Sequence, residues 1–313
     1  MGNKSNTTTY VGRFAPSPSG PLHFGSLVTA LASYLDARIN HGKWLVRIED
    51  IDLAREQPGA SKLILKTLEA YGLYWDGDVL FQSGRNEAYD KVLDILFRKE
   101  KLYPCTCTRK KLAGLNGVYP GYCRNKPVNT SQPYGLRLLC NHNVIQFHDR
   151  IQGTQSFDLS KLGDVILKRK DGLYAYQLAV SVDDEFQGIT HIVRGVDLLD
   201  STPRQLYLQS QLNYQHPIYA HVPVITESNG NKLSKQNHAP AIPLNNPHPL
   251  LIKALTALGL QPDTHIFTNS IEDILLWGVK NWSIKKLFGK KEVLNDGILP
   301  KLPTKPNTLY TVE

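Results

Sequence analysis

Two segments that lie far apart in the chain carry residues suited to binding phosphate groups. The first, APSPSGPLHFGS at residues 15–26, places Gly20, His23 and Gly25 between a short apolar run and a helical pattern. A helix N-terminus after such a turn presents unpaired N–H groups and a partial positive charge, and glycines let a ligand approach the backbone closely. We therefore expect a phosphate site with His23 as a hydrogen-bond donor. The simpler alternative is a histidine that only caps the helix.

The second segment is NGNKLSKQ at residues 229–236, in which Lys232 and Lys235 flank Ser234. Two ammonium groups on a loop suit a triphosphate whose negative charge grows as pyrophosphate leaves. The alternative interpretation is a solvated basic loop that binds no ligand.

Taken together, the two segments resemble the HIGH and KMSKS signatures of the class I aminoacyl-tRNA synthetases. The matching residues are HFGS at 23–26 and KLSKQ at 232–236, and Ser26 stands where the first signature has its second histidine. The longer stretches RFAPSPSGPLHFGS, RIEDID and DDEFQGITHIVRGVDLL are similar to the glutamyl branch of that class. The resemblance runs from about residue 10 to residue 240.

This resemblance implies roles for individual residues at the nucleotide site. His23, Lys232 and Lys235 are implied as catalytic residues. Gly25, Ser26 and Lys235 are implied as ATP contacts, with Mg²⁺ accompanying the nucleotide.

A glutamate pocket needs cations for the side-chain carboxylate and an anion for the ammonium group. Arg13, near the end of the first apolar run, and Arg194 in HIVRG offer guanidinium groups, which bind carboxylates in a bidentate manner. Glu49 follows a second apolar run and could hold the amine. The alternative is that these charges form ordinary ion pairs. The resemblance implies L-glutamate contacts from the same three residues and adds Ser17 and Tyr176.

Three of the four cysteines, Cys105, Cys107 and Cys123, fall within 19 residues. Zn²⁺ with tetrahedral geometry suits such thiolates, although three reduced structural cysteines are the alternative. Spacing alone leaves Cys140 or a histidine as the fourth ligand. The resemblance instead implies a Cys-x-Cys…Tyr-x-x-x-Cys set, in which Tyr119 completes one structural zinc site within an inserted acceptor-binding-like subdomain.

Apolar periodicity predicts the elements that must position these residues. Strands are expected at 9–15, 44–48, 134–139, 144–148 and 164–168, and helices at 26–40, 59–72, 85–100, 249–259 and 270–282. Strand, helix, strand, helix at this spacing favours an α/β fold with a parallel sheet. With the resemblance, we expect a Rossmann-like class I synthetase (HUP-type) catalytic domain, interrupted by the zinc-containing subdomain.

Four regions are expected along the chain. They are a first half of the catalytic domain at 1–102, the insert at 103–170, a second half with the lysine loop at 171–240, and a short helical C-terminal region at 241–313.

Composition indicates a globular protein with an anionic partner. The net charge is +8 and the isoelectric point is about 9.1, which favours RNA, DNA or a phosphate-rich substrate. No uninterrupted apolar stretch has membrane-spanning length, and the N-terminus lacks the apolar region of a secretory signal. We expect a cytoplasmic monomer with no membrane partner.

Only 77 residues follow Gln236, whereas a glutamyl-tRNA synthetase has a large anticodon-binding domain after its KMSKS loop. This architecture resembles the glutamyl-Q tRNA(Asp) synthetases, short paralogues that consist of the catalytic domain alone. The resemblance implies activation of L-glutamate with ATP without tRNA, followed by transfer to the queuosine base in the anticodon of tRNA-Asp.

Three alternatives remain. The first is a truncated glutamyl-tRNA synthetase that charges the 3′ end of tRNA-Glu, and the second is a nucleotidyltransferase of the wider HxGH group. The third is a non-catalytic RNA-binding paralogue, which the retained His, Gly, Ser and Lys residues of the two signatures disfavour.

Overall fold

A parallel sheet lies at the centre of the protein and positions the residues of interest. The computed structural model describes residues 9–298 except 116–117, 141–143, 229, 231 and 234–238. Strand β1 pairs in parallel with β2, β2 with β3, and β9 with β10. The two groups meet where Thr190, just before β9, donates its N–H to the Val11 carbonyl of β1 at 2.9 Å. The resulting strand order is β3-β2-β1-β9-β10. The chain builds the sheet outward in one direction from β1 and in the other from β9, and open α/β sheets bind ligands at such a switch point.

The strands have the following bounds. They are β1 Val11–Phe14, β2 Lys43–Ile48, β3 Leu80–Phe81, β4 Leu102–Cys105, β5 Gly135–Leu138, β6 Val144–Asp149, β7 Gly153–Asp158, β8 Val165–Lys168, β9 His191–Gly195, β10 Ile218–Val222, β11 Val224–Thr226 and β12 Glu292–Leu294.

Helices cover both the sheet and its insert. The α-helices are α1 Phe24–Ile39, α2 Ala60–Ala70, α3 Asn86–Arg98, α4 Arg109–Leu112, α5 Leu159–Leu162, α6 Tyr176–Phe186, α7 Thr202–Leu212, α8 His248–Ala257 and α9 Ile271–Asn281. Short 3₁₀ helices are η1 Leu53–Arg55, η2 Gln82–Arg85, η3 Val196–Ser201, η5 Thr264–Thr268, η6 Ile284–Leu287 and η7 Asn295–Gly297.

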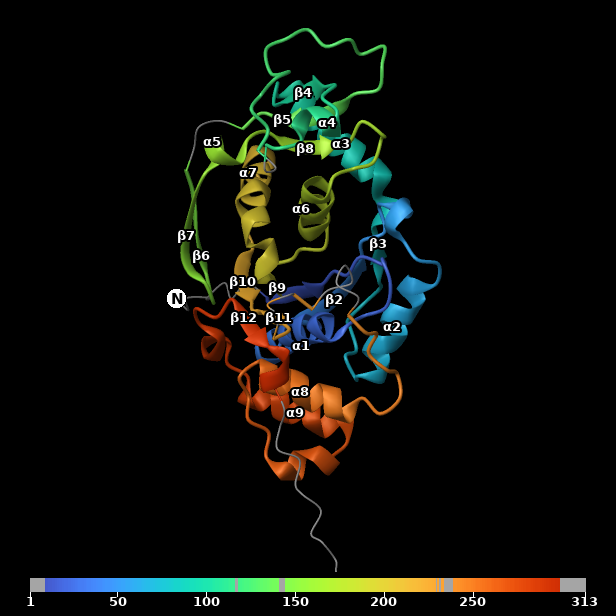
Figure 1. Ribbon diagram of the computed structural model, residues 1–313, viewed down its shortest axis with the longest axis vertical. Coiled ribbons are helices and arrows are strands. Elements are labelled where there is room, and N and C mark those ends of the chain that lie inside the picture. The colour runs from blue at the N-terminus through green and yellow to red at the C-terminus, as the bar shows by residue number, and fades with distance from the viewer. Residues whose placement is uncertain are drawn as a thin grey trace, which may run out of the picture.

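Helix α1 lies at the centre of the larger hydrophobic core. Its apolar residues Leu27, Leu31 and Leu35 are fully buried, and they belong to the same cluster as Trp44 of β2 and Leu255 of α8. Helices α8 and α9 pack against α1 on the side away from the insert, as Figure 1 shows at the lower end of the molecule. The C-terminal helices therefore hold the helix that follows the glycine-containing turn.

The insert forms the opposite end of the elongated molecule (Figure 1). Strands β4, β5 and β8 make an antiparallel sheet, and β6 and β7 form an antiparallel hairpin. A second hydrophobic core joins the antiparallel sheet to α3, α6 and α7. Strand β6 also pairs with β10 through Asp149 and Tyr219, which links the hairpin to the central sheet.

The structure agrees with most elements expected from the sequence and adds several. The expected helix at 26–40 begins two residues earlier, at Phe24, because His23 supplies the N-cap. None of the expected strand ranges corresponds to β3, β4, β7, β9, β10, β11 or β12. None of the helices in the described ranges has both the length and the apolar character needed to cross a bilayer.

Candidate functional site

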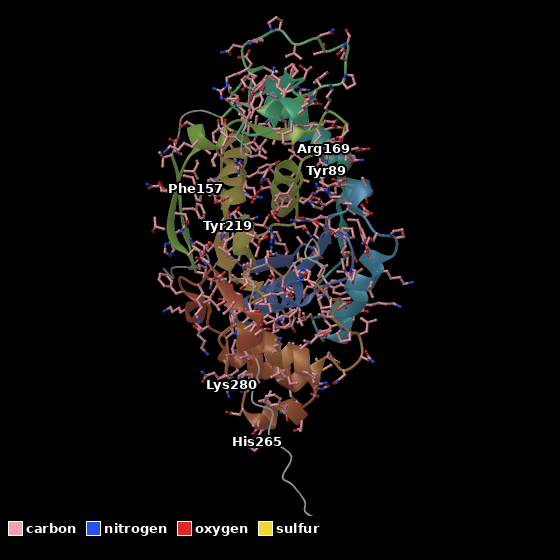
Figure 2. The ribbon with its side chains drawn as sticks, viewed as in Figure 1. Tyr89, Phe157, Arg169, Tyr219, His265 and Lys280 are labelled. Atoms are coloured by element: carbon pink, nitrogen blue, oxygen red, sulfur yellow. The ribbon has the colours of Figure 1, made fainter. Side chains whose placement is uncertain are left out.

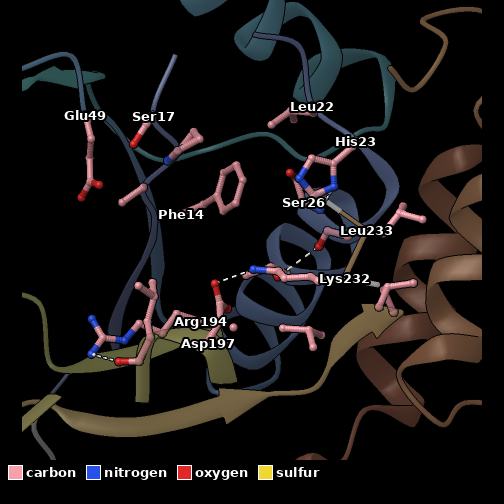
Figure 3. A pocket seen from close by; sticks show the side chains of 18 of the residues that line it. Phe14, Ser17, Leu22, His23, Ser26, Glu49, Arg194, Asp197, Lys232 and Leu233 are labelled. Carbon is pink, nitrogen blue, oxygen red and sulfur yellow. Dashed lines mark hydrogen bonds and ion pairs between the residues drawn. The ribbon is translucent and has the colours of Figure 1, made fainter. Parts of the chain in front are cut away.

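A cavity of about 400 Å³ opens where β1, β2 and β9 end and α1 begins. The sequence-predicted residues that line it are Arg13, Ser17, His23, Gly25, Ser26, Glu49, Tyr176, Arg194 and Lys232. Lys235 lies outside the described residues, as does Ser234 between the two lysines. Figure 3 shows Glu49 and Arg194 on one side of the cavity and His23 and Ser26 on the other. One side therefore carries the charges suited to an amino acid, and the other carries the start of α1.

The start of α1 is capped by the histidine of the first segment. The Nδ1 atom of His23 accepts a hydrogen bond from the Ser26 N–H at 3.3 Å. His23 therefore caps α1, and its role at a phosphate site stays a prediction. A Cβ atom at Gly25 would lie 3.2 Å from the His23 ring and 3.3 Å from the Leu233 carbonyl, so this glycine allows the lysine loop to approach α1 closely.

Lys232 reaches the cavity from a segment anchored on strand β11. The Leu233 N–H donates to the Ile225 carbonyl at 2.7 Å, and Lys232 forms a β-bridge with Thr226. Its ammonium group forms an ion pair with Asp197 at 2.5 Å across the cavity (Figure 3). Both side chains are partly exposed, so an incoming anion can compete for this ammonium group.

Arg13 is held by a buried carboxylate. Its Nε and Nη2 atoms donate to the two oxygens of Asp184 at 3.0 and 3.3 Å, and Arg47 adds a 2.9 Å ion pair to the same carboxylate. Burial alone raises the pKa of Asp184, but the two guanidinium groups outweigh burial and hold this pKa below its usual range. Asp184 is therefore ionised and fixes the position of Arg13.

Glu49 is a buried carboxylate at the cavity wall. Its Oε1 lies 3.6 Å from Nη2 of Arg47, beyond hydrogen-bond distance, and has no hydrogen-bond partner among the described residues. Burial raises the pKa of Glu49 above its usual range, although the charges of Arg47 and Arg13 act in the opposite direction. A buried carboxylate oxygen with unused acceptor capacity suits the ammonium group of an amino acid.

Arg194 is also buried, and neutral groups hold it. Its Nε donates to Nε2 of His221 at 3.0 Å, and its Nη2 donates to Oγ1 of Thr202 at 2.8 Å. Its Nη1 is buried and lacks a hydrogen-bond partner within the described part of the chain. Tyr176, at the start of α6, lines the same cavity, and burial raises its pKa.

Sequence reasoning missed the residues that support these charges. Asp184 lies in a stretch quoted for its family resemblance, but its pairing with Arg13 spans 171 positions and leaves no local signal. The available signal for His221 was a polar residue inside the apolar run IYAHV, because a buried polar group requires partners.

The three clustered cysteines come together in the insert with Tyr119. Their Sγ atoms lie within 4.8 Å of one another, with 3.6 Å between Cys107 and Cys123. The Tyr119 hydroxyl lies 3.4 Å from the Cys105 sulfur and 3.6 Å from the Cys107 sulfur. A tetrahedral zinc site with bonds of about 2.3 Å has ligand–ligand distances of about 3.8 Å, so these four side chains fit Zn²⁺.

Cys140, the alternative fourth zinc ligand that spacing suggested, lies outside the cysteine cluster. The Cys140 N–H donates to Asp164, and its thiol is directed to the Leu138 carbonyl at 3.8 Å. Neither Cys140 nor a histidine belongs to the metal-ligating group found among the described residues. Spacing alone could not discriminate between these ligands, because the fold determines which side chains meet.

The chain matches one protein family over most of its length. The family described as tRNA synthetases class I (E and Q), catalytic domain, aligns with residues 10–272, a range that includes every cavity-lining residue.

Relatives and solved structures agree with this match. The glutamyl-Q tRNA(Asp) synthetase of Pseudomonas putida (strain W619) is 50% identical over 278 residues, or 88% of this chain and 94% of the relative. That of Pseudomonas syringae pv. syringae (strain B728a) is 51% identical over 277 residues, or 87% and 92%. The crystal structure of a glutamate tRNA ligase from Elizabethkingia meningosepticum CCUG26117, in complex with its amino acid, has a TM-score of 0.77 at 26% identity. The structural match covers 91% of this chain and 67% of the Elizabethkingia chain.

Proposed function

Because the chain belongs to the class I tRNA synthetases for glutamate and glutamine, and within them to the glutamyl-Q tRNA(Asp) synthetases, we propose a two-step reaction for it. The first step activates L-glutamate with ATP in the absence of tRNA. The second step transfers glutamate to the queuosine base in the anticodon of tRNA-Asp. The observation that carries the first step is a single cavity with paired amino-acid charges at one side and a helix N-terminus with Lys232 at the other.

The amino-acid side of the cavity recognises both charged ends of glutamate. Arg13 and Arg194 bind carboxylate, and Arg194 offers its Nη1, which has no partner in the described part of the chain. Glu49 accepts hydrogen bonds from the ammonium group. Ser17 and Tyr176 also line the cavity and contact the bound amino acid. In this proposal the α-carboxylate faces the nucleotide side, where it can reach the α-phosphate.

The nucleotide side binds the phosphates of ATP. The Gly25 N–H, the Ser26 side chain and the positive end of α1 bind the phosphates, with His23 beside them. A carboxylate oxygen of glutamate attacks the α-phosphorus, and the bond to pyrophosphate breaks. Lys232 and Lys235 stabilise the charge that develops on the departing pyrophosphate. Mg²⁺ enters with ATP and supplies further positive charge to the phosphates.

The second step needs no protein nucleophile, because the adenylate is already activated. A hydroxyl oxygen of the queuosine ring attacks the glutamyl carbonyl, an ester bond forms, and AMP leaves. The protein contributes mainly by holding the two reactants in place. In the insert, Cys105, Cys107, Cys123 and Tyr119 bind one structural Zn²⁺ outside the cavity.

Two assays test the reaction and its acceptor. Glutamate-dependent exchange of pyrophosphate into ATP without tRNA tests the first step, and aspartate serves as the control amino acid. Labelled glutamate with purified tRNAs then tests the second, and nuclease mapping locates the label. Label in the anticodon of queuosine-containing tRNA-Asp is expected, and label at the 3′ end of tRNA-Glu would establish a truncated glutamyl-tRNA synthetase. Absence of glutamate-dependent exchange without tRNA would contradict the proposed first step and therefore the proposed reaction.

The chain is also proposed to work as a monomer. Light scattering on the purified protein should give a mass near 35.1 kDa. A mass of twice that value at working concentration would contradict a monomer.

A further inference from the structure

Three buried polar side chains lie in a row across neighbouring strands beside the cavity. His221 of β10 is the direct cross-strand partner of Arg194 in β9, and β6, which carries Asp149, pairs with β10 on its other side. Arg194 is 3% exposed, and His221 and Asp149 are completely buried. Only Arg194 lines the cavity, so the other two cannot touch a ligand there.

Hydrogen bonds in this row run in one direction. The Asp149 Oδ1 atom accepts backbone N–H groups from Ile151 at 2.9 Å, Gln152 at 2.8 Å and His221 at 3.1 Å. Its Oδ2 lies 2.5 Å from Nδ1 of His221. The three backbone donors fix the carboxylate, which then accepts a proton from Nδ1 of the imidazole.

This arrangement determines the tautomer of His221. With the proton on Nδ1, Nε2 is left as an acceptor, and it receives the Nε–H of Arg194 at 3.0 Å. A proton on Nε2 would place two donors against each other, and a doubly protonated imidazolium would add a second positive charge beside the guanidinium. Burial is the largest influence that lowers the pKa of His221, and the charge of Arg194 adds to it, whereas Asp149 and Asp197 act in the opposite direction.

The hydrogen bonds to His221 and Thr202 leave one nitrogen of Arg194 for a ligand. Nε is taken by His221, Nη2 by Thr202 of α7 and the Leu198 carbonyl, and Nη1 has no partner among the described residues. The Arg194 guanidinium also lies 5.3 Å from the Tyr219 ring, which stacks on His221. These contacts hold the guanidinium in one orientation before a carboxylate arrives, which lowers the entropic cost of binding.

We infer that Asp149 and His221 are positioning residues that hold Arg194, through a neutral imidazole, in the orientation that binds the carboxylate of the amino-acid substrate. This inference rests on the proposed function, in which Arg194 binds glutamate. It assigns to both residues an effect on glutamate affinity and none on the binding of ATP.

Two substitutions at one position separate the contact of Nδ1 with Asp149 from those of Nε2, which faces Arg194 and also lies 3.2 Å from Oγ1 of Thr202. In His221→Asn the amide can replace Nδ1–H toward Asp149 but does not reach Arg194. In His221→Gln the amide oxygen reaches the position of Nε2 and can accept from Arg194. We expect His221→Asn to raise the KM for glutamate about 10- to 100-fold, the loss typical of one hydrogen bond to a charged group. KM for ATP and kcat of exchange should stay within about threefold of the unaltered chain, and His221→Gln should restore most of the glutamate affinity.

Two further variants complete the set. Asp149→Asn should raise the glutamate KM as well, because an amide N–H facing Nδ1 moves the imidazole proton to Nε2. His265→Asn is the matched control, since His265 is exposed beyond α8 and α9, far from Tyr219 (Figure 2). An unchanged glutamate KM in His221→Asn, or an equal loss in His221→Gln and His221→Asn, would overturn the inference.

A measurement on the unaltered chain keeps the inference testable if the variants do not fold. Long-range ¹H–¹⁵N correlation at pH 7, with the His221 ring assigned among the ten histidines through its contact with the Tyr219 ring, should show a neutral ring with its proton on Nδ1. A His221 signal from the Nε2–H tautomer or the imidazolium would overturn the inference. Absence of glutamate-dependent exchange in the unaltered chain would instead contradict the proposed function, and the spectrum would still decide the arrangement of His221.

Discussion

The two arginines of the amino-acid site differ in how their charge is balanced. Arg13 forms a bidentate ion pair with Asp184, so part of its positive charge is already compensated. Arg194 is held by the neutral hydroxyl of Thr202 and by His221. A buried guanidinium without an anionic partner attracts a carboxylate more strongly than a paired one, because little water screens it. We therefore expect Arg194 to contribute more than Arg13 to glutamate affinity.

Replacing the buried carboxylate tests ammonium recognition. We expect Glu49→Gln to raise the KM for glutamate about 10- to 100-fold, because a charged hydrogen bond to the ammonium group is lost.

The pH dependence of glutamate binding follows from the raised pKa of Glu49: the carboxylate binds ammonium above this pKa and loses its charge as the pH falls through it. Exchange assays from about pH 8 down to about pH 5 should show the glutamate KM rising in the unaltered chain. The part of this rise that disappears in Glu49→Gln belongs to Glu49, and an identical profile in both proteins would contradict the role.

The lysine loop makes a separate prediction at Lys235. We expect Lys235→Ala to lower the kcat of glutamate-dependent exchange about 10²-fold or more, in the range seen when one transition-state donor is removed. The glutamate KM should change little, because the lysine acts on the leaving pyrophosphate. Lys291→Ala, outside the cavity lining, is the control. Unchanged exchange in Lys235→Ala would exclude a catalytic role for this lysine.

Among the secondary-structure elements, the longer helices could be predicted from the sequence and the shortest strands could not. The pattern at 249–259 corresponds to α8, because its apolar residues recur every three or four positions and pack on α1. Strand β12 has three residues and exists through its pairing with β11, which lies about seventy positions earlier in the chain. Such pairing leaves no local periodicity, so it cannot be predicted from single-sequence patterns.

The candidate site, too, contains residues that could be predicted from the sequence and residues that could not. Arg13, Glu49 and Arg194 could be nominated because charged residues near the ends of apolar runs stand out, and the structure brings them to one cavity. Their catalytic and binding roles remain predictions. His221 stands out only as a polar residue in an apolar run, and its pairing with Asp149 and Arg194 could not be predicted, because the three residues lie on separate strands that only the folded sheet brings together.

The cysteine cluster gives a prediction for the insert. We expect about one Zn²⁺ per purified chain, and Cys123→Ser should lose most of it because one thiolate ligand is removed. Cys140→Ala is the matched control, since Cys140 lies outside the cluster. Exchange without tRNA should be retained in Cys123→Ser, because none of the cluster residues lines the cavity. Metal analysis by mass spectrometry measures the first effect, and a metal content that is equal in both variants would contradict the ligand set.

Across the protein, one buried carboxylate joins segments from three distant parts of the chain. Asp36 of α1 accepts the Tyr10 hydroxyl at 2.6 Å, the Arg150 guanidinium at 2.5 and 3.2 Å, and the Trp282 indole N–H at 3.0 Å. Tyr10 precedes β1, Arg150 follows β6, and Trp282 ends α9. The N-terminal strand, the hairpin of the insert and the C-terminal helices are therefore held to α1 at one point.

Substituting this carboxylate should weaken the protein as a unit. Both oxygens of Asp36 accept from two donors each, so in Asp36→Asn the amide NH₂ must face donors, and Arg150 loses its anionic partner. We expect the free energy of unfolding to fall by about 3 kcal/mol, the lower end of the range for breaking a buried charge pair, because Arg150 is partly exposed. Urea denaturation followed by circular dichroism measures this change, and Asp94→Asn on the exposed face of α3 should change stability by less than about 0.5 kcal/mol. Asp36 does not line the cavity, so glutamate-dependent exchange well below the unfolding transition should be unaffected. Equal stability of Asp36→Asn and Asp94→Asn would show that the three segments are held to α1 by apolar packing alone.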